Sequence, residues 1–232
     1  MVGFIYSQSV HCVVTAGPTY EALDKVRRLT NFSTGRLGCE LAAFLTDRGH
    51  EVTLLIGEQA TYSGPRKAAR VATFSTTADL SERLHSLANQ RVQAVCHPAA
   101  VSDFAFDKIF QRSGTGELAE IKSAKISTRQ GTLLAELVPT GKIIAQLRSW
   151  FPQAWIAGWK YEVDGDRAGA LGAARDQIQE CHTNACVANG PAYGKGFGLV
   201  RLEGESMDLA SSAELFAALE ELMITRLGQA AT

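Results

Sequence analysis

The sequence has no long hydrophobic run and no excess of charge of either sign. No apolar stretch reaches the about 20 residues that a membrane-spanning helix needs. The first ten residues lack the basic segment and cleavage site of a secretory signal. With 23 basic and 24 acidic residues, a broad surface for nucleic acid or a membrane is not expected. These absences predict a cytoplasmic protein that binds neither.

Paired cysteine motifs and the common nucleotide loops are missing too. The five cysteines form no CxxC pair, which is typical of buried thiols in a reducing compartment. Cys181, His182 and Cys186 lack a second pair of ligands nearby, so a metal site there is not expected. Neither GxGxxG nor GxxxxGK[ST] occurs, which weakens dinucleotide and P-loop interpretations.

The chain nevertheless has what a large core needs. Its 232 residues are 46% hydrophobic, enough for one domain over residues 1–232. Apolar runs at 11–17 and 51–56 predict strands, and leucines at helical spacing before Gly49 predict a helix between them. The alternation continues at 70–97. It predicts an α/β fold: a doubly wound, mostly parallel Rossmann-like sheet flanked by helices.

One segment interrupts this alternation. Residues 104–124 contain few large apolar side chains and indicate an extended, mobile excursion, and we expect 104–135 to form a flap or dimerisation element. Regular structure is expected to return after it, with strands at 132–138, 154–159 and 185–188, helices at 140–150, 166–180 and 212–227, and a glycine-rich loop at 190–198.

Candidate ligand-binding residues follow the predicted strands, since parallel sheets bind ligands beyond their carboxyl ends. Between Lys25 and Arg36 there are four cations and no acid, which suits a phosphorylated ligand. The stretch Ser33-Thr34-Gly35-Arg36-Leu37-Gly38 leads into the first helix, where backbone N–H groups can approach an anion. The alternative is ordinary capping by Ser33 or Thr34 and close packing at the two glycines.

Four other side chains each allow a functional and a structural interpretation. Asp103, just past a strand, either binds Mg²⁺ with a nucleotide or caps a turn. His97 is either a base or a satisfied strand-end histidine. Lys125 either neutralises a phosphate or is solvated, and Trp159 either stacks on a ligand or packs in the core.

Several short motifs follow one another in a specific order. They are Thr15-Ala16-Gly17-x-Thr19, Asp24-x-Val26-Arg27, Asn31-x-Ser33-Thr34-Gly35-x-Leu37-Gly38, Ala99-Ala100-Val101-Ser102-Asp103, Ala124-Lys125-Ile126-Ser127, Thr140-x-Lys142-Ile143-Ile144, Gly158-Trp159-Lys160 and Val187-Ala188-Asn189. From about residue 12 to about residue 225 they resemble phosphopantothenate–cysteine ligase, the second half of the bifunctional DNA/pantothenate metabolism flavoprotein. The flavin-binding decarboxylase half has no counterpart, so the sequence looks like the standalone form and no flavin is expected.

The resemblance implies a reaction in coenzyme A biosynthesis. Members of the family activate 4′-phosphopantothenate with CTP or ATP, with Mg²⁺, as an acyl-nucleotidylate, and the amine of L-cysteine then displaces the nucleotide. Members are homodimers whose excursions cross to the partner, so some site residues are expected in trans.

The same resemblance assigns roles to residues. Lys125 and Asn31 would be catalytic, with Lys125 on the triphosphate and Asn31 also holding the pantothenate portion. Asp103 would coordinate Mg²⁺ or the nucleotide. Nucleotide-binding residues would be Gly17, Ser33, Thr34, Gly35, Arg36, Gly38, His97, Pro98, Ala99, Asp103, Gly141, Lys142, Ile143, Ile144 and Trp159, and substrate-binding residues Asn31, Arg27 and Ala100.

Departures from the family pattern leave two alternatives open. The family has phosphate-binding lysines on the helix before Asn189, where this sequence has Gln177 and Glu180-Cys181. A catalytically impaired homologue that binds a nucleotide or phosphopantothenate is therefore one alternative. A dinucleotide-dependent reductase is another, weakened because Glu58 alone is a poor ribose anchor. Pro18 and Arg36 also replace a usual Gly and Lys, and residues 1–10 match no motif.

Overall fold

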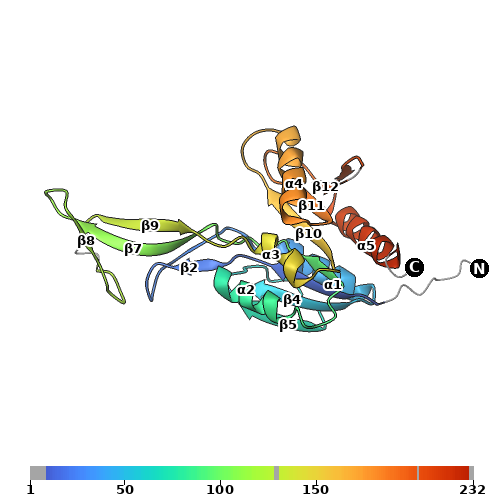
Figure 1. Cartoon of the computed structure of the whole chain (residues 1–232), viewed down its shortest axis with the longest axis horizontal. Coiled ribbons are helices and arrows are strands. Elements are labelled where there is room, and N and C mark those ends of the chain that lie inside the picture. The colour runs from blue at the N-terminus through green and yellow to red at the C-terminus, as the bar shows by residue number, and fades with distance from the viewer. Residues whose placement is uncertain (1–8, 128–130, 203, 230–232) are drawn as a thin grey trace, which may run out of the picture.

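A mostly parallel sheet of eight strands forms the centre of the computed structural model, which describes residues 9–127, 131–202 and 204–229 (Figure 1). In spatial order its strands are β13 (Met207–Leu209), β12 (Phe197–Arg201), β11 (Ala185–Asn189), β10 (Trp155–Tyr161), β6 (Ala94–Cys96), β1 (His11–Ala16), β4 (Glu51–Gly57) and β5 (Arg70–Phe74). The six from β5 to β11 run parallel, whereas β12 and β13 are antiparallel. The predicted fold class is confirmed.

Helices cover both faces of this sheet, as a doubly wound fold requires. Alternate strand residues such as Val14 pack with α1 (Arg36–Asp47) and α5 (Ser212–Gln229), while their neighbours such as Val13 pack with α2 (Thr77–Ser86) and α3 (Ile143–Trp150). α4 (Arg167–Cys181) covers β11 and β12 on the face of α3. Strands buried on both faces explain why β1 and β4 consist of nearly continuous apolar runs.

Residues 104–127 and 131–139, which we call the arm, project from the sheet (Figure 1). They form a separate antiparallel sheet in the order β8-β7-β9, with β7 at Phe104–Arg112, β8 at Leu118–Glu120 and β9 at Leu133–Pro139. β7 and β9 are joined by backbone hydrogen bonds along most of their length. The sequence analysis missed β7 and β8, because their residues show neither a buried run nor a regular alternation.

A second short pair of strands lies beside the arm. β2 (Tyr20–Ala22) and β3 (Arg28–Thr30) form an antiparallel hairpin in a segment where no strand was predicted, and β2 contacts β7. The expected loop at 190–198 also ends early, since β12 already begins at Phe197, and β13 was not expected. We call residues 20–30 the hairpin. No helix within the described ranges is long and apolar enough to cross a membrane.

Candidate active site

The carboxyl ends of β1 and β6 mark the switch point of the sheet. These two strands are neighbours, and the chain proceeds outward from them in opposite directions. An isolated parallel bridge between Pro18 and Ala100 prolongs their pairing into the following loops. In folds of this kind, ligands bind in the crevice at such a point. We call this edge, with the loops after β1, β6 and β10, the switch-point edge.

Two glycines at the switch-point edge adopt left-handed backbone conformations. Gly17 has φ 77°, and Gly35, with φ 82°, is the N-cap residue of α1 without a capping side chain. A Cβ atom on Gly38 would lie 2.6 Å from the carbonyl oxygen of Thr15. The close-packing interpretation of Gly38 is therefore confirmed. Side-chain capping of α1 is found in part, because Oγ1 of Thr34 accepts a hydrogen bond from the backbone N–H of Arg36 (3.3 Å), while the N-cap residue Gly35 offers only backbone.

The basic stretch before α1 is largely neutralised within the chain. Asp24, whose side chain is 1% exposed, forms an ion pair with Arg27, and that guanidinium holds the pKa of the Asp24 carboxyl well below its usual range. Arg28 lies over the ring of Tyr20, and Arg36 is 3.7 Å from a carboxylate oxygen of Glu40. Counting cations in the sequence thus overstates the positive charge available to a phosphate here.

Buried hydroxyl groups tie the β1 and β6 loops together. Oγ1 of Thr15 accepts a hydrogen bond from the backbone N–H of Ala99 (3.2 Å) and lies 2.9 Å from Nδ1 of His97. Thr19 accepts from the backbone N–H of Ser102 (2.8 Å). Burial lowers the pKa of His97 to about 4, so its ring is neutral at pH 7. The structural interpretation of His97 as a satisfied strand-end residue is thus supported for Nδ1.

Asn31, which follows the hairpin, and Asp103 both lie at the loop after β6. The side-chain amide of Asn31 donates to the carbonyl oxygen of Ala100 (3.1 Å). The Asp103 carboxylate accepts from Nζ of Lys142 (2.5 Å), and both side chains are more than half exposed. The two segments also meet through the backbone, because the N–H of Thr140 donates to the Asp103 carbonyl oxygen (2.9 Å). A solvent-accessible carboxylate and an ammonium therefore face each other at the switch-point edge.

The residues after Lys142 and the end of β10 complete the edge. Gly141 is exposed, Ile143 is buried in the core and Ile144 is partly buried. Trp159 packs partly against the core, yet its indole N–H is buried and has no hydrogen-bond partner in the described ranges. Its packing supports the core interpretation, whereas the unpaired donor leaves a ligand contact open.

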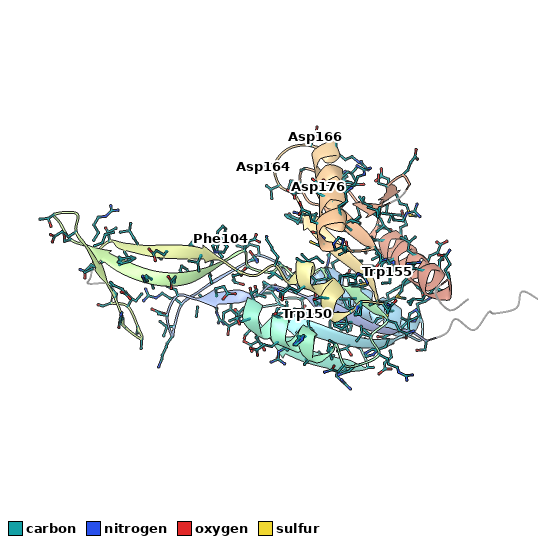
Figure 2. All side chains as sticks on the ribbon, in the orientation of Figure 1. Phe104, Trp150, Trp155, Asp164, Asp166 and Asp176 are labelled. Atoms are coloured by element: carbon teal, nitrogen blue, oxygen red, sulfur yellow. The ribbon has the colours of Figure 1, made fainter. Side chains whose placement is uncertain are left out.

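Lys125 does not lie with Asp103. It is exposed, and the backbone around it contacts the tip of the hairpin: Lys25 N–H donates to the Ala124 carbonyl oxygen and Ile126 N–H to Asp24. Figure 2 marks Phe104 where the arm leaves the sheet. The backbone N–H of Ile121 donates to the Ile109 carbonyl oxygen. Ile109 lies five residues beyond Phe104 along β7, which is about 17 Å at strand spacing. Lys125 thus adjoins the hairpin tip, and no hydrogen bond or ion pair joins it to Asn31 or Asp103 within the described residues.

The sequence analysis missed the hydroxyl pair of Thr15 and Thr19. Both residues flank Gly17 at the end of a strand, and both are fully buried. Their position on either side of a strand-end glycine was the available signal, because a buried hydroxyl must find a partner. Within the apolar run of β1, however, Thr15 looks like another core residue.

Comparison with known proteins places this chain beside characterised families. A family model described as the DNA/pantothenate metabolism flavoprotein C-terminal domain matches residues 7–214. The "Coenzyme A biosynthesis bifunctional protein CoaBC" of Thermococcus kodakarensis is 32% identical over 76% of this chain and 40% of its own length. The protein of that name from Bacillus subtilis is 27% identical over 91% of this chain and 50% of its own. The chain thus spans half or less of these relatives.

Solved structures show the same fold. The DNA/pantothenate metabolism flavoprotein from Streptococcus pneumoniae superimposes with a TM-score of 0.78 at 24% identity, covering 93% of this chain and 98% of that chain. A variant of Cab2 in complex with phosphopantothenate-cysteine gives a TM-score of 0.71 at 18% identity, covering 96% of this chain and 89% of the other. Both likenesses include nearly the whole chain.

Proposed function

Because this chain belongs to the family of the DNA/pantothenate metabolism flavoprotein C-terminal domain, we propose that it is a ligase of coenzyme A biosynthesis that joins 4′-phosphopantothenate to L-cysteine. The family match over residues 7–214 carries this proposal. It is supported by relatives named for coenzyme A biosynthesis and by the likeness to a fold solved with phosphopantothenate-cysteine.

The proposed reaction has two steps. A carboxylate oxygen of 4′-phosphopantothenate attacks the α-phosphorus of CTP or ATP, a P–O bond forms, and the bond to pyrophosphate breaks. The amine of L-cysteine then attacks the acyl carbon, loses a proton, forms the amide and releases the nucleoside monophosphate. Two anions must meet in the first step, so nearby cations and backbone N–H groups lower its barrier.

The switch-point edge offers groups for both steps. The backbone around Gly35 and the first turn of α1 is suited to phosphate, and Lys142 supplies a positive charge. Asn31, whose amide donates to the Ala100 carbonyl oxygen, is proposed to contact the pantothenate portion. The remaining nucleotide contacts are proposed at Gly17, Ser33, Thr34, Arg36, Gly38, His97, Pro98, Ala99, Gly141, Ile143, Ile144 and Trp159, and the other substrate contacts at Arg27 and Ala100. Arg27 is the exception in position, because its guanidinium donates to the Ile126 carbonyl oxygen (2.7 Å) at the hairpin tip.

Asp103 fits a magnesium ion that arrives with the nucleotide. Its carboxylate is exposed, and the described residues contain no group of three or more metal-ligating side chains. Mg²⁺ characteristically keeps several waters and takes one or two carboxylates plus substrate phosphates. Asp103 would hold the ion, which would neutralise charge on the phosphates when bound. Lys142, the present partner of Asp103, would then be released toward the phosphate.

In a homodimer, Lys125 of one chain would reach the crevice at the switch-point edge of the other chain. Arm and hairpin expose large apolar side chains, which is unusual for a surface that stays in water. They are Val26, Leu29, Phe104, Leu118, Leu137 and Val138, and Phe32, two residues past the hairpin, is exposed as well. A second copy that covers them would place the arm of one chain over the edge of the other.

An oligomer measurement tests that arrangement. Leu137→Asp adds a charge to the exposed side of the arm and should yield monomers by size-exclusion chromatography with light scattering. Leu202→Asp, at a side chain that is 64% exposed outside the arm, is the matched control. A dimer that survives Leu137→Asp, or a monomeric Leu137→Asp variant with full turnover, would contradict action of Lys125 in trans.

The reaction itself is tested by incubating the purified chain with 4′-phosphopantothenate, L-cysteine and Mg²⁺, with CTP or ATP in parallel. Pyrophosphate release and the mass of phosphopantothenoylcysteine are the expected results. Asn31→Asp should let the acyl-nucleotidylate accumulate, detectable by mass spectrometry, while Asn89→Asp, an exposed control, should not. Absence of the intermediate would remove the assigned role of Asn31.

Gln177 keeps one alternative in view. Its side chain is buried and donates to Sγ of Cys186, so this position of α4 supplies no cation for a triphosphate. A catalytically impaired homologue would bind a nucleotide or phosphopantothenate and gain thermal stability without releasing pyrophosphate. The dinucleotide-dependent reductase is separated by adding NAD(P)H to the same thermal measurement, because it alone would bind NAD(P)H.

A further inference from the structure

Thr15 lies at the end of β1 in a fully buried position. Its Oγ1 atom contacts two groups of the loop after β6, the backbone N–H of Ala99 (3.2 Å) and Nδ1 of His97 (2.9 Å). Neither Thr15 nor His97 has another side-chain partner within the described residues. The protonation pattern of this small network follows from counting its protons.

A threonine hydroxyl has one proton and two lone pairs. The N–H of Ala99 uses one lone pair. If Nδ1 of His97 carried a proton, Oγ1 would accept twice and its own proton would have no acceptor, which is costly at a site without solvent. If the hydroxyl instead donates to Nδ1, every group is paired. The imidazole proton then belongs on Nε2.

Nε2 of His97 is available to a ligand. Within the described part of the chain it has no hydrogen-bond partner. It is also not among the fully buried side-chain N and O atoms there that lack a partner. Nε2 therefore retains some contact with solvent, although His97 as a whole is only 6% exposed, and His97 adjoins residues already assigned to the nucleotide. Burial, which lowers the pKa of His97 to about 4, keeps the ring neutral.

We propose that Thr15 is a positioning residue that holds His97 as the neutral Nε2–H tautomer, so that His97 donates a hydrogen bond to an acceptor atom of the bound nucleotide. The ligand half of this inference rests on the proposed function. His97 is then a fixed donor that recognises the nucleotide, and it takes no proton during the reaction. The backbone of Ala99 is positioned by the same hydroxyl.

Nitrogen NMR tests the tautomer without any ligand. Histidine labelled with ¹⁵N in the full chain gives long-range ring correlations at pH 7.5, and His97→Gln identifies the His97 signals among the five histidines. The expected pattern is a protonated Nε2 and an unprotonated Nδ1, in the wild type and in Thr15→Ser. In Thr15→Val the Nδ1 signal should move, because its donor is removed. A proton on Nδ1 in the wild type would overturn the inference.

Thr53 and His11 provide a matched control pair. Oγ1 of Thr53 lies 3.3 Å from Nε2 of His11 on neighbouring strands, away from the loops of the edge. Thr53→Val should change the His11 signals and leave those of His97 and the affinity for nucleotide unchanged. An effect of Thr53→Val on affinity equal to that of Thr15→Val would show that loss of a buried hydroxyl, and not positioning of His97, is responsible.

Calorimetric titration with CTP or ATP and Mg²⁺ tests the donor. His97→Leu should weaken binding about tenfold, the usual effect of losing one hydrogen bond. His97→Gln, whose amide N–H can reach the place of Nε2, should stay within about threefold, and Thr15→Ser should match the wild type. Unchanged affinity in His97→Leu would overturn the donor role.

Failure of the proposed function gives a different result. If the folded wild type binds neither CTP nor ATP, both the proposed function and the donor role fall, while the NMR pattern still decides the tautomer. If Thr15→Val does not fold, the spectra of the wild type and Thr15→Ser decide the tautomer, and His97→Gln against His97→Leu decides the donor role.

Discussion

The central sheet and the arm are built from the same kind of backbone and differ in what covers it. Every residue of β1 after His11 is buried, whereas all but the first two residues of β9 are exposed. The sheet is closed on both faces by helices of its own chain. The arm is held by its β7–β9 ladder and by its contact with the hairpin. The central sheet thus has its own hydrophobic core, whereas the arm leaves most of its β9 side chains exposed.

That difference separates stability from assembly. Side chains of the central sheet contribute to the free energy of unfolding, because each takes apolar surface out of water. Exposed side chains of the arm contribute little until another surface covers them. Substitutions in the arm should therefore act on oligomeric state and activity, and substitutions in the sheet on folding.

Lys125→Ala should have the largest effect, on activity alone. Loss of a cation that stabilises the reacting phosphate should lower pyrophosphate release by about a thousandfold. The exposed side chain makes no ion pair in the described residues, so the unfolding midpoint should not move. Lys122→Ala, another exposed lysine of the arm, is the control. Near-normal turnover of Lys125→Ala would end the catalytic assignment, and a large loss of stability would break the division itself.

Leu54→Ala and Leu137→Ala compare the regions directly. Leu54 in β4 is fully buried, and its truncation should cost about 2–5 kcal/mol in urea unfolding. Leu137 in β9 is 49% exposed, and its truncation should cost less than about 1 kcal/mol in the monomer. Measurement at several protein concentrations separates folding from dimerisation. Equal costs at low concentration would show that the arm has a core of its own.

The sequence foretold the sheet better than the arm for a physical reason. An apolar run such as Val52–Ile56 indicates a buried strand because two faces must be covered. In β7 the exposed and half-buried residues follow no simple alternation, so the run from Phe104 carries no comparable signal. Pairing of β7 with β9 depends on residues about 30 positions apart, which a local pattern does not contain.

The same reason explains what could be foreseen of the site. Asp103 and Gly17 were expected at one edge, because the ends of parallel strands meet there. The position of Lys125 at the hairpin tip depends on the carboxylate of Asp24, a long-range contact without a sequence signal. The Thr15–His97 pair likewise joins residues 82 positions apart. Helices and strands can be predicted from the local sequence pattern. Polar contacts between loops depend on the assembled fold.

Acidification should weaken the sheet before the arm. The pKa of His97 is about 4 in the folded state, against about 6.5 in an unfolded chain. Between these values the unfolded state binds more protons, so stability falls as pH decreases from about 6.5 to about 4, by up to about 3 kcal/mol. His97→Gln should flatten this part of the profile in urea unfolding. An unchanged slope would show that another group titrates there.

Asp24→Asn should give the smallest effect, confined to the joint between hairpin and arm. The Asp24 carboxylate accepts from the backbone N–H of Ile126 and pairs with Arg27, and its pKa lies well below the usual range. A carboxyl of low folded pKa contributes stability above its unfolded pKa and loses it only as pH falls through the folded value. The joint should therefore stay closed at pH 5, where His97 already weakens the sheet.

In Asp24→Asn the amide of Ile126 should exchange with solvent several-fold faster at pH 5 and pH 7, while amides of β1 and β4 keep their rates, because only the joint opens. Asp47→Asn, which removes an exposed ion pair with Lys67 on the far side of α1, is the control. If β1 and β4 also exchange faster, the arm and the sheet unfold as one unit, and the distinction between a self-covered sheet and a surface-presenting arm fails at its junction.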